Sequence, residues 1–294
     1  MQYLILVLVV ISMTLNSVAQ KQYDIRAKKQ NTFLFMSVFI FVAMLFFVVS
    51  SGFKLNFTLA VLPYSIAFAT VYSLSLLTGF MAIKYGPLSI TMLVIAYSLI
   101  IPTFYGMIFL KEPIGVTAYV GIAMIMVSLL LVNFPKKAKS SEANGEKSTK
   151  ITLKWVLIVV CAFFVNGLNS VVQKEQQMKF DGAYKSEFMI VGLLLSAVVL
   201  FACSFIGDGR KEFLPKLKQS IPYGVMGGVA NGVMNLGVLI LTGAIPNAIL
   251  FPSISGGGVI LGFLVSTFIY KEKLSLLQTM GFVIGTVSVV ILNL

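Results

Sequence analysis

Residues 15–21 read LNSVAQK, and residues 168–174 read LNSVVQK. The two stretches differ at one position, and each closes an apolar run, residues 3–19 in the first case and residues 152–172 in the second. A signal peptide cannot lie in the middle of a chain, so the repeat favours a retained first helix over a cleaved leader. The repetition predicts that the chain arose by duplication of one unit.

The repeat keeps its register toward the end of each half. Chance rarely preserves so many identities at nearly one spacing, which strengthens the prediction of a duplication. The matches are Pro63-Tyr64 with Pro222-Tyr223, Lys111-Glu112 with Lys271-Glu272, and Gly121, Val127, Ser128 and Asn133 with Gly281, Val287, Ser288 and Asn293.

The composition places the chain among membrane proteins. Of its 294 residues, 58% are hydrophobic and only 11% are charged, whereas soluble domains are about half apolar and about a quarter charged. A helix that crosses the hydrocarbon layer needs about 20 mostly apolar residues. Ten apolar runs of roughly this kind cover the chain: residues 3–19, 32–51, 58–83, 87–110, 115–132, 152–172, 187–206, 220–241, 247–270 and 274–292.

These runs fall into two groups of five, which predicts an all-α integral membrane protein with ten transmembrane helices. The first five-helix repeat covers residues 1–133 and the second covers residues 151–294, with a basic, polar linker at residues 134–150. An odd number of crossings makes the second copy enter the membrane from the opposite side. The two five-helix repeats are therefore expected to be inverted.

The net charge of +12 comes from short basic clusters between the apolar runs. Such clusters are typical of topology signals, and without a basic stripe they argue against nucleic-acid binding. Their distribution predicts a multi-pass protein of the plasma (inner) membrane with both termini outside. The lipid bilayer is therefore an expected partner.

Patterns typical of enzymes and metal sites are missing from the sequence. It has no histidine, and both cysteines, Cys161 and Cys203, lie inside apolar runs. The local motifs of metalloproteases, serine hydrolases and nucleotide-binding loops do not occur. We expect no catalytic residues, no metal and no cofactor.

Two amide pairs are candidates for lining a polar cavity. Asn16 and Gln20 lie four residues apart and so share a helix face, and Asn169 and Gln173 repeat the pair in the second half. An amide inside hydrocarbon must find a hydrogen-bond partner. The four side chains could bind a small-molecule substrate, or they could hydrogen-bond neighbouring helices and hold the bundle together.

A third amide pair, Asn231 and Asn235, lies on a run rich in glycine, where a ligand could approach the backbone closely. Tyr72 and Tyr97 could add hydroxyl or aromatic contacts from the first half, although tyrosine also serves in cores and at membrane interfaces. Small residues at every fourth position predict close helix contacts. They are Gly224, Gly228 and Gly232 in the second half and Ser65, Ala69 and Ser73 in the first.

Lys21 and Lys174 lie at the predicted ends of the first and sixth helices. A cation there interacts favourably with the helix dipole and can reach the lipid headgroups. At the mouth of a cavity, the same two lysines would attract an anionic substrate. Glu112, which precedes Pro113, favours the start of the next helix.

Three short motifs carry a family likeness. Residues 82–89 read AIKYGPLS, residues 109–113 read FLKEP, and residues 268–272 read FIYKE; Gly121 follows the second motif and Gly281 the third. Together with the two five-helix halves, they resemble the drug/metabolite transporter superfamily, in particular its ten-helix EamA-type branch. The likeness extends along nearly the whole chain.

The resemblance implies efflux or exchange of metabolites, amino acids or drugs by alternating access, through a central cavity lined by helices 1, 3, 4, 6, 8 and 9. It also implies cytoplasmic termini, which is opposite to what the lysines predict. The membrane-embedded acid of the small multidrug-resistance relatives has no counterpart in the first helix here.

We therefore expect a transporter that moves a small organic solute across the plasma membrane, as a monomer or homodimer. The alternative is a membrane-embedded enzyme or lipid-carrier translocase that acts on an isoprenoid or lipid substrate, and a third hypothesis is a membrane scaffold or sensor. An enzyme would need acids or histidines clustered on the membrane face. A sensor would need a sizeable soluble domain, and the sequence contains neither feature.

Overall fold

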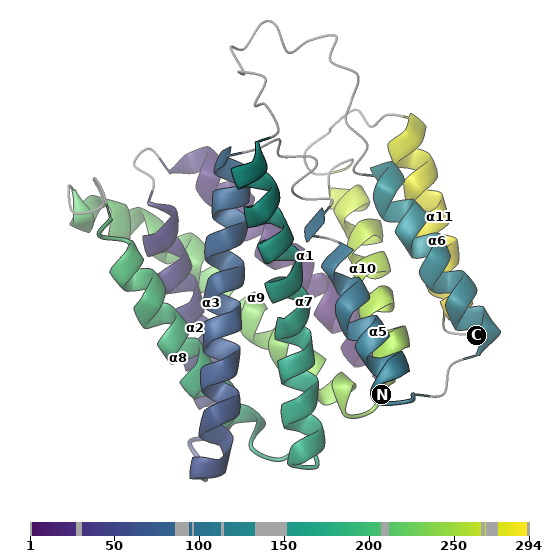
Figure 1. Ribbon diagram of the computed structural model, residues 1–294. Coiled ribbons are helices and arrows are strands. Elements are labelled where there is room, and N and C mark those ends of the chain that lie inside the picture. The colour runs from purple at the N-terminus through teal and green to yellow at the C-terminus, as the bar shows by residue number, and fades with distance from the viewer. Residues whose placement is uncertain are drawn as a thin grey trace, which may run out of the picture. The chain divides into compact units, whose positions relative to one another are not determined.

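The computed structural model describes residues 2–27, 31–85, 94–95, 97–112, 115–132, 152–206, 212–265, 268 and 276–292 (Figure 1). The predicted linker at residues 134–150 lies outside the described residues. Within the described ranges every regular element is a helix, and no strand occurs.

The α-helices of the described ranges follow one another with short connections. They are α1 (Gln2–Arg26), α2 (Thr32–Ser50), α3 (Leu62–Tyr85), α5 (Ile100–Ile108), α6 (Val116–Val132), α7 (Leu153–Lys179), α8 (Lys185–Cys203), α9 (Phe213–Thr242), α10 (Asn247–Leu264) and α11 (Leu276–Leu292). Two short 3-10 helices, η1 (Leu59–Val61) and η2 (Tyr97–Leu99), precede α3 and α5.

Among the described residues, six helical segments are long and apolar enough to cross a membrane, judged by length and composition. Two further apolar segments, Val116–Leu131 and Thr279–Ser288, are shorter. The prediction of an all-helical membrane protein agrees with these segments, while the count of ten crossings stays a prediction. The six are Gln2–Gln20, Thr32–Ser50, Leu59–Gly79, Leu153–Lys179, Lys185–Cys203 and Phe213–Thr242.

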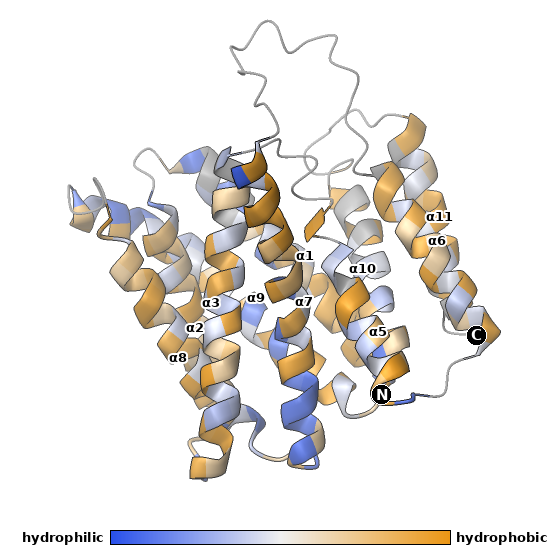
Figure 2. Ribbon diagram, in the orientation of Figure 1, coloured by the Kyte–Doolittle hydropathy of each residue, from blue (hydrophilic) through white to orange (hydrophobic). Residues whose placement is uncertain are grey.

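The polarity of exposed and buried side chains is the one expected in lipid. Large apolar side chains such as Leu8, Val198 and Phe201 are exposed, whereas the polar side chains of Gln176 and Ser196 are completely buried. Soluble proteins favour the opposite arrangement. Figure 2 shows the apolar character along α8. Such faces suit a hydrocarbon environment, in which polar groups must be satisfied inside the protein.

The chain forms two compact units, each built from both halves of the sequence. Unit 1 comprises residues 1–73 and 172–244, and unit 2 comprises residues 74–171 and 245–294. Helices α3 and α7 therefore each contribute residues to both units.

In unit 1, the glycine row of α9 packs closely on α2. A Cβ added at Gly228 would lie 2.5 Å from the carbonyl oxygen of Phe39, and one at Gly224 would lie 2.7 Å from Cγ1 of Val38. At Gly232 the added atom would lie 2.5 Å from the ring of Phe46. Small residues allow this approach, as predicted for a packing seam.

The matching small residues of α3 contact α8 in the same unit. The Ser65 hydroxyl donates to the Phe188 carbonyl oxygen at 3.1 Å, and the Ser196 hydroxyl lies 3.4 Å from the Ala69 carbonyl oxygen. A Cβ added at Gly192 would lie 2.6 Å from the ring of Phe68. Small residues thus support close helix contacts from both halves of the sequence.

In unit 2, α6 and α11 are each 17 residues long and pack on one another. The Ser128 hydroxyl joins them by donating to the Gly281 carbonyl oxygen at 2.7 Å. The prediction for Glu112 is wrong, because its carboxylate accepts from the backbone N–H of Asn247 at 2.7 Å and so caps α10. The first N–H groups of a helix have no partner within the helix, which makes them available to an acid from elsewhere in the chain.

Candidate functional site

A chain of buried polar contacts links α3 and α9 in unit 1. Nδ2 of Asn231 lies 3.5 Å from the hydroxyl oxygen of Tyr72, to which it donates. Nδ2 of Asn235 donates to both the backbone oxygen and Oδ1 of Asn231, each at 2.9 Å. The side chains of Asn231 and Asn235 are only 2% and 3% exposed. The structure therefore joins Tyr72, Asn231 and Asn235, three of the predicted site residues, and we call these three residues the Tyr72 cluster.

Aromatic packing fixes the position of Tyr72. Its ring stacks on that of Phe68 with centroids 5.2 Å apart, and Phe68 meets Phe188 of α8 edge to face at 5.2 Å. Among the described residues, the Tyr72 oxygen accepts a hydrogen bond but its own O–H has no acceptor. A hydroxyl held in this way can donate to a bound solute.

The C-terminal turns of α7 carry a run of buried polar side chains, which Figure 2 shows as hydrophilic. Gln173 and Gln177 are 3% and 2% exposed, and the side-chain oxygen of each has no hydrogen-bond partner within the described residues. Gln176 donates to the Ala183 carbonyl oxygen at 3.0 Å. An unsatisfied buried polar atom costs about 1–3 kcal/mol. Water or a polar solute that reached these oxygens would remove that cost.

The prediction that Lys21 and Lys174 end their helices is wrong. α1 continues to Arg26 and α7 to Lys179. Hydropathy marks only the apolar part of a helix, and glutamine, lysine, glutamate and methionine continue the helix beyond it because their helix propensities are high.

The two lysines can be placed to different extents. The side chain of Lys174 is buried, and its Nζ donates to the carbonyl oxygen of Thr242 at 2.7 Å. Thr242 is the last residue of α9, whose final carbonyl groups lack partners within the helix, so the cation stabilises that terminus. The side chain of Lys21 lies outside the described part of the chain.

The first amide pair behaves as its spacing predicts. Nδ2 or Nε2 donors of such pairs reach one turn along a helix, and Nε2 of Gln20 donates to Oδ1 of Asn16 at 2.7 Å. The second pair does not repeat this bond, since Oδ1 of Asn169 has no partner among the described residues. Asn169 belongs to unit 2 and Gln173 to unit 1, although both lie on α7.

Tyr97 lies in unit 2, apart in the chain's organisation from the Tyr72 cluster of unit 1. Its hydroxyl donates to the Met126 carbonyl oxygen at 2.8 Å and ties η2 to α6. This bond uses the proton that Tyr97 was predicted to offer to a substrate. The structure thus gives Tyr97 a packing contact.

One buried polar group of unit 2 was not predicted from the sequence. Nδ2 of Asn166 donates to the Ser98 hydroxyl oxygen at 2.6 Å, and the Ser75 hydroxyl donates to Oδ1 of Asn166 at 3.1 Å. The residue has no amide partner four positions away, so the spacing that found the other amides could not find it. An asparagine between apolar neighbours is nevertheless a visible signal, because such an amide needs a partner.

Replacing Asn166 by Leu is expected to lower the free energy of unfolding by about 1–3 kcal/mol, because both hydroxyl partners lose their bond. Thermal unfolding of the purified protein in detergent measures this change. Asn169→Leu on the same helix is the matched control, since it removes an oxygen that has no partner. Equal losses in the two variants would contradict the role given to Asn166.

Comparison with known proteins adds information about the fold. No protein-family model and no curated protein matches this sequence significantly. A solved crystal structure, described only as that of a protein, is similar over 100% of this chain and 98% of that chain, with a TM-score of 0.73 and 12% sequence identity. At this identity the likeness concerns architecture alone. The fold and composition define an all-helical protein with helices suited to a membrane.

Proposed function

We propose that the protein is a transporter that moves a small organic solute across the plasma membrane by alternating access, through efflux or exchange. It would do so with ten transmembrane helices arranged as two inverted five-helix repeats. The proposal agrees with the resemblance to the EamA-type branch of the drug/metabolite transporters. It rests chiefly on the hydrogen bond between Tyr72 and Asn231.

That hydrogen bond joins residues at equivalent positions of the two repeats. Tyr72 and Asn231 are 159 residues apart, the same spacing as that between Tyr64 and Tyr223, which the repeat pairs. Equivalent residues meet each other only near the two-fold axis that relates two copies. In transporters with inverted repeats, the substrate site lies at the interface of the repeats. The Tyr72 cluster has the position in the sequence repeat that such a site requires.

The chemistry of the cluster fits a polar solute. The Tyr72 hydroxyl offers a donor, and the two amides offer further donors and acceptors without a fixed charge. Gln173 adds a buried oxygen without a partner from the same unit. Few, well-placed polar groups among apolar helices are typical of small-molecule sites.

The test is a flux measurement in proteoliposomes. A panel of amino acids, nucleosides, sugars and cationic dyes is offered with and without a pH gradient, and protein-free liposomes serve as the control. We expect saturable uptake of at least one class. The absence of saturable flux for every class, from protein shown to be folded, would count against a transporter of these solutes.

A further inference from the structure

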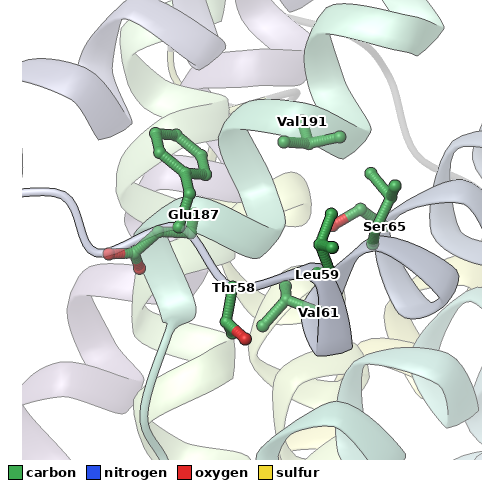
Figure 3. Close-up of a pocket in the computed structure, with 8 residues that line it drawn as sticks. Thr58, Leu59, Val61, Ser65, Glu187 and Val191 are labelled. Atoms are coloured by element: carbon green, nitrogen blue, oxygen red, sulfur yellow. The ribbon is translucent and has the colours of Figure 1, made fainter.

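A pocket of unit 1 lies between α8 and the segment that leads into α3. Its volume is about 150 Å³, and most of its lining is apolar. Figure 3 shows Glu187 and Val191 of α8 on one side, with Thr58, Leu59 and Val61 on the other. Phe57 and Leu59 at the pocket are themselves exposed. The space equals that of about five water molecules, so a small organic group fits.

Glu187 is the charged group of this pocket. The residue is only 7% exposed, and its Oε1 accepts from the backbone N–H of Asn56 at 2.7 Å. Oε2 has no hydrogen-bond partner, and no cation lies in ion-pair contact with the carboxylate, among the described residues. The nearby Lys185 instead donates to the carbonyl oxygen of Gly182.

This environment leaves a buried carboxylate poorly compensated. Glu187 lies in the first turn of α8, where the helix dipole favours a negative charge. One hydrogen bond and a dipole offset only part of the cost of removing a carboxylate from water, and a buried charge normally has a partner of opposite sign. The site therefore lacks one component, a cation that can donate a hydrogen bond to Oε2.

The shape of the pocket defines the rest of that component. Apolar walls favour an alkyl group, and the exposed ring of Phe57 can interact with a cation at its face. We propose that the Glu187 pocket binds an alkylammonium group, with the ammonium on the carboxylate and the alkyl carbons between Leu59, Val61 and Val191. The group can belong to a free amine or to the headgroup of an amino lipid. This inference is independent of the proposed transport function, because the pocket and the Tyr72 cluster share no residue.

The first experiment measures binding of n-butylammonium to the purified full-length protein by calorimetry in detergent. n-Butanol and butyrate are the comparison ligands, because they have the same alkyl chain without the positive charge. We expect n-butylammonium to bind and the other two to bind at least about tenfold more weakly, since a charge-assisted hydrogen bond is lost. Equal binding of the three ligands would overturn the proposal.

Substitutions then assign the site to Glu187. Glu187→Gln preserves shape and can still accept from Asn56, and we expect it to weaken n-butylammonium at least about tenfold. Asp181→Asn is the matched control, because it removes an exposed negative charge from the preceding turn and asparagine tolerates the left-handed backbone there. Glu187→Asp keeps the charge and should retain the preference for n-butylammonium over n-butanol. Undiminished binding in folded Glu187→Gln would overturn the proposal.

Lipid composition distinguishes the two sources of the ammonium group. Thermal stability is compared in vesicles of phosphatidylethanolamine mixed with phosphatidylglycerol and in vesicles where phosphatidylcholine replaces the ethanolamine lipid. A shift toward stability in ethanolamine lipid that disappears in Glu187→Gln supports a lipid headgroup. Calorimetric binding of n-butylammonium without such a shift supports a free amine. If neither signal depends on Glu187, the pocket is not an ammonium site.

Discussion

Replacing Asn231 by Leu is expected to reduce solute flux by about tenfold to a hundredfold while the protein still folds in the membrane. The change removes the donor to Tyr72 and the side-chain acceptor for Asn235. Loss of such bonds to a buried site costs about 1–3 kcal/mol, and each 1.4 kcal/mol corresponds to about a factor of ten. Initial rates in proteoliposomes, for a solute that the wild-type protein carries, measure the effect.

The same assay includes a variant on the neighbouring surface of α9. Val229 is exposed, so Val229→Leu changes the helix without touching the Tyr72 cluster and should transport normally. Asn235→Leu should behave like Asn231→Leu because the two amides form one hydrogen-bonded pair. Wild-type flux in both asparagine variants would remove them from the site.

Replacing Gly228 by Leu is expected to lower the free energy of unfolding by about 3 kcal/mol or more. The first added carbon alone would lie 2.5 Å from the Phe39 carbonyl oxygen and 2.7 Å from Cβ of Val42. Backbone atoms cannot move aside as a flexible side chain does, so α2 and α9 must separate. Unfolding of the purified protein by heat or denaturant in detergent measures the loss.

Gly243→Leu provides the control for this substitution. Gly243 lies at the end of α9, is exposed, and a Cβ added there would meet only the Ile240 carbonyl oxygen at 3.6 Å. That distance is an ordinary contact, so stability should change by less than about 1 kcal/mol. A Gly228 variant as stable as the Gly243 variant would show that the seam tolerates bulk.

Hydropathy located the helices well but misplaced some of their ends. The run at residues 32–51 corresponds to α2 and the run at residues 187–206 to α8, because apolar composition and helix length coincide there. α9 begins at Phe213, seven residues before its predicted run, because its first turns carry Lys216 and Lys218. A helix that extends past the apolar layer gains polar residues, and hydropathy then no longer reports it.

Contacts within the site could be predicted only where they are local. Asn16 with Gln20 and Asn231 with Asn235 follow from the spacing of one helical turn. The bond between Tyr72 and Asn231 crosses two helices, and helix periodicity contains no information about it. The repeat does contain such information, since it pairs the two positions. A search for polar residues at equivalent positions would have selected this contact.

Long-range partners explain the remaining differences. Glu112 caps α10, Lys174 caps α9, and Tyr97 donates to Met126. In each case a polar side chain satisfies a backbone group that its own helix leaves without a partner or that lies on another segment. The choice of partner depends on tertiary packing, and a single sequence does not specify it.

A polar route that opens to each side of the membrane in turn is tested most directly at Gln173. A Gln173→Cys variant, with Cys161 and Cys203 replaced by alanine, is treated with a membrane-impermeant maleimide from each side of oriented vesicles. We expect labelling from both sides, and protection by a transported solute, because the buried Gln173 oxygen without a partner would face the route. Labelling from neither side, or from one side only and unaffected by solute, would contradict alternating access at this residue.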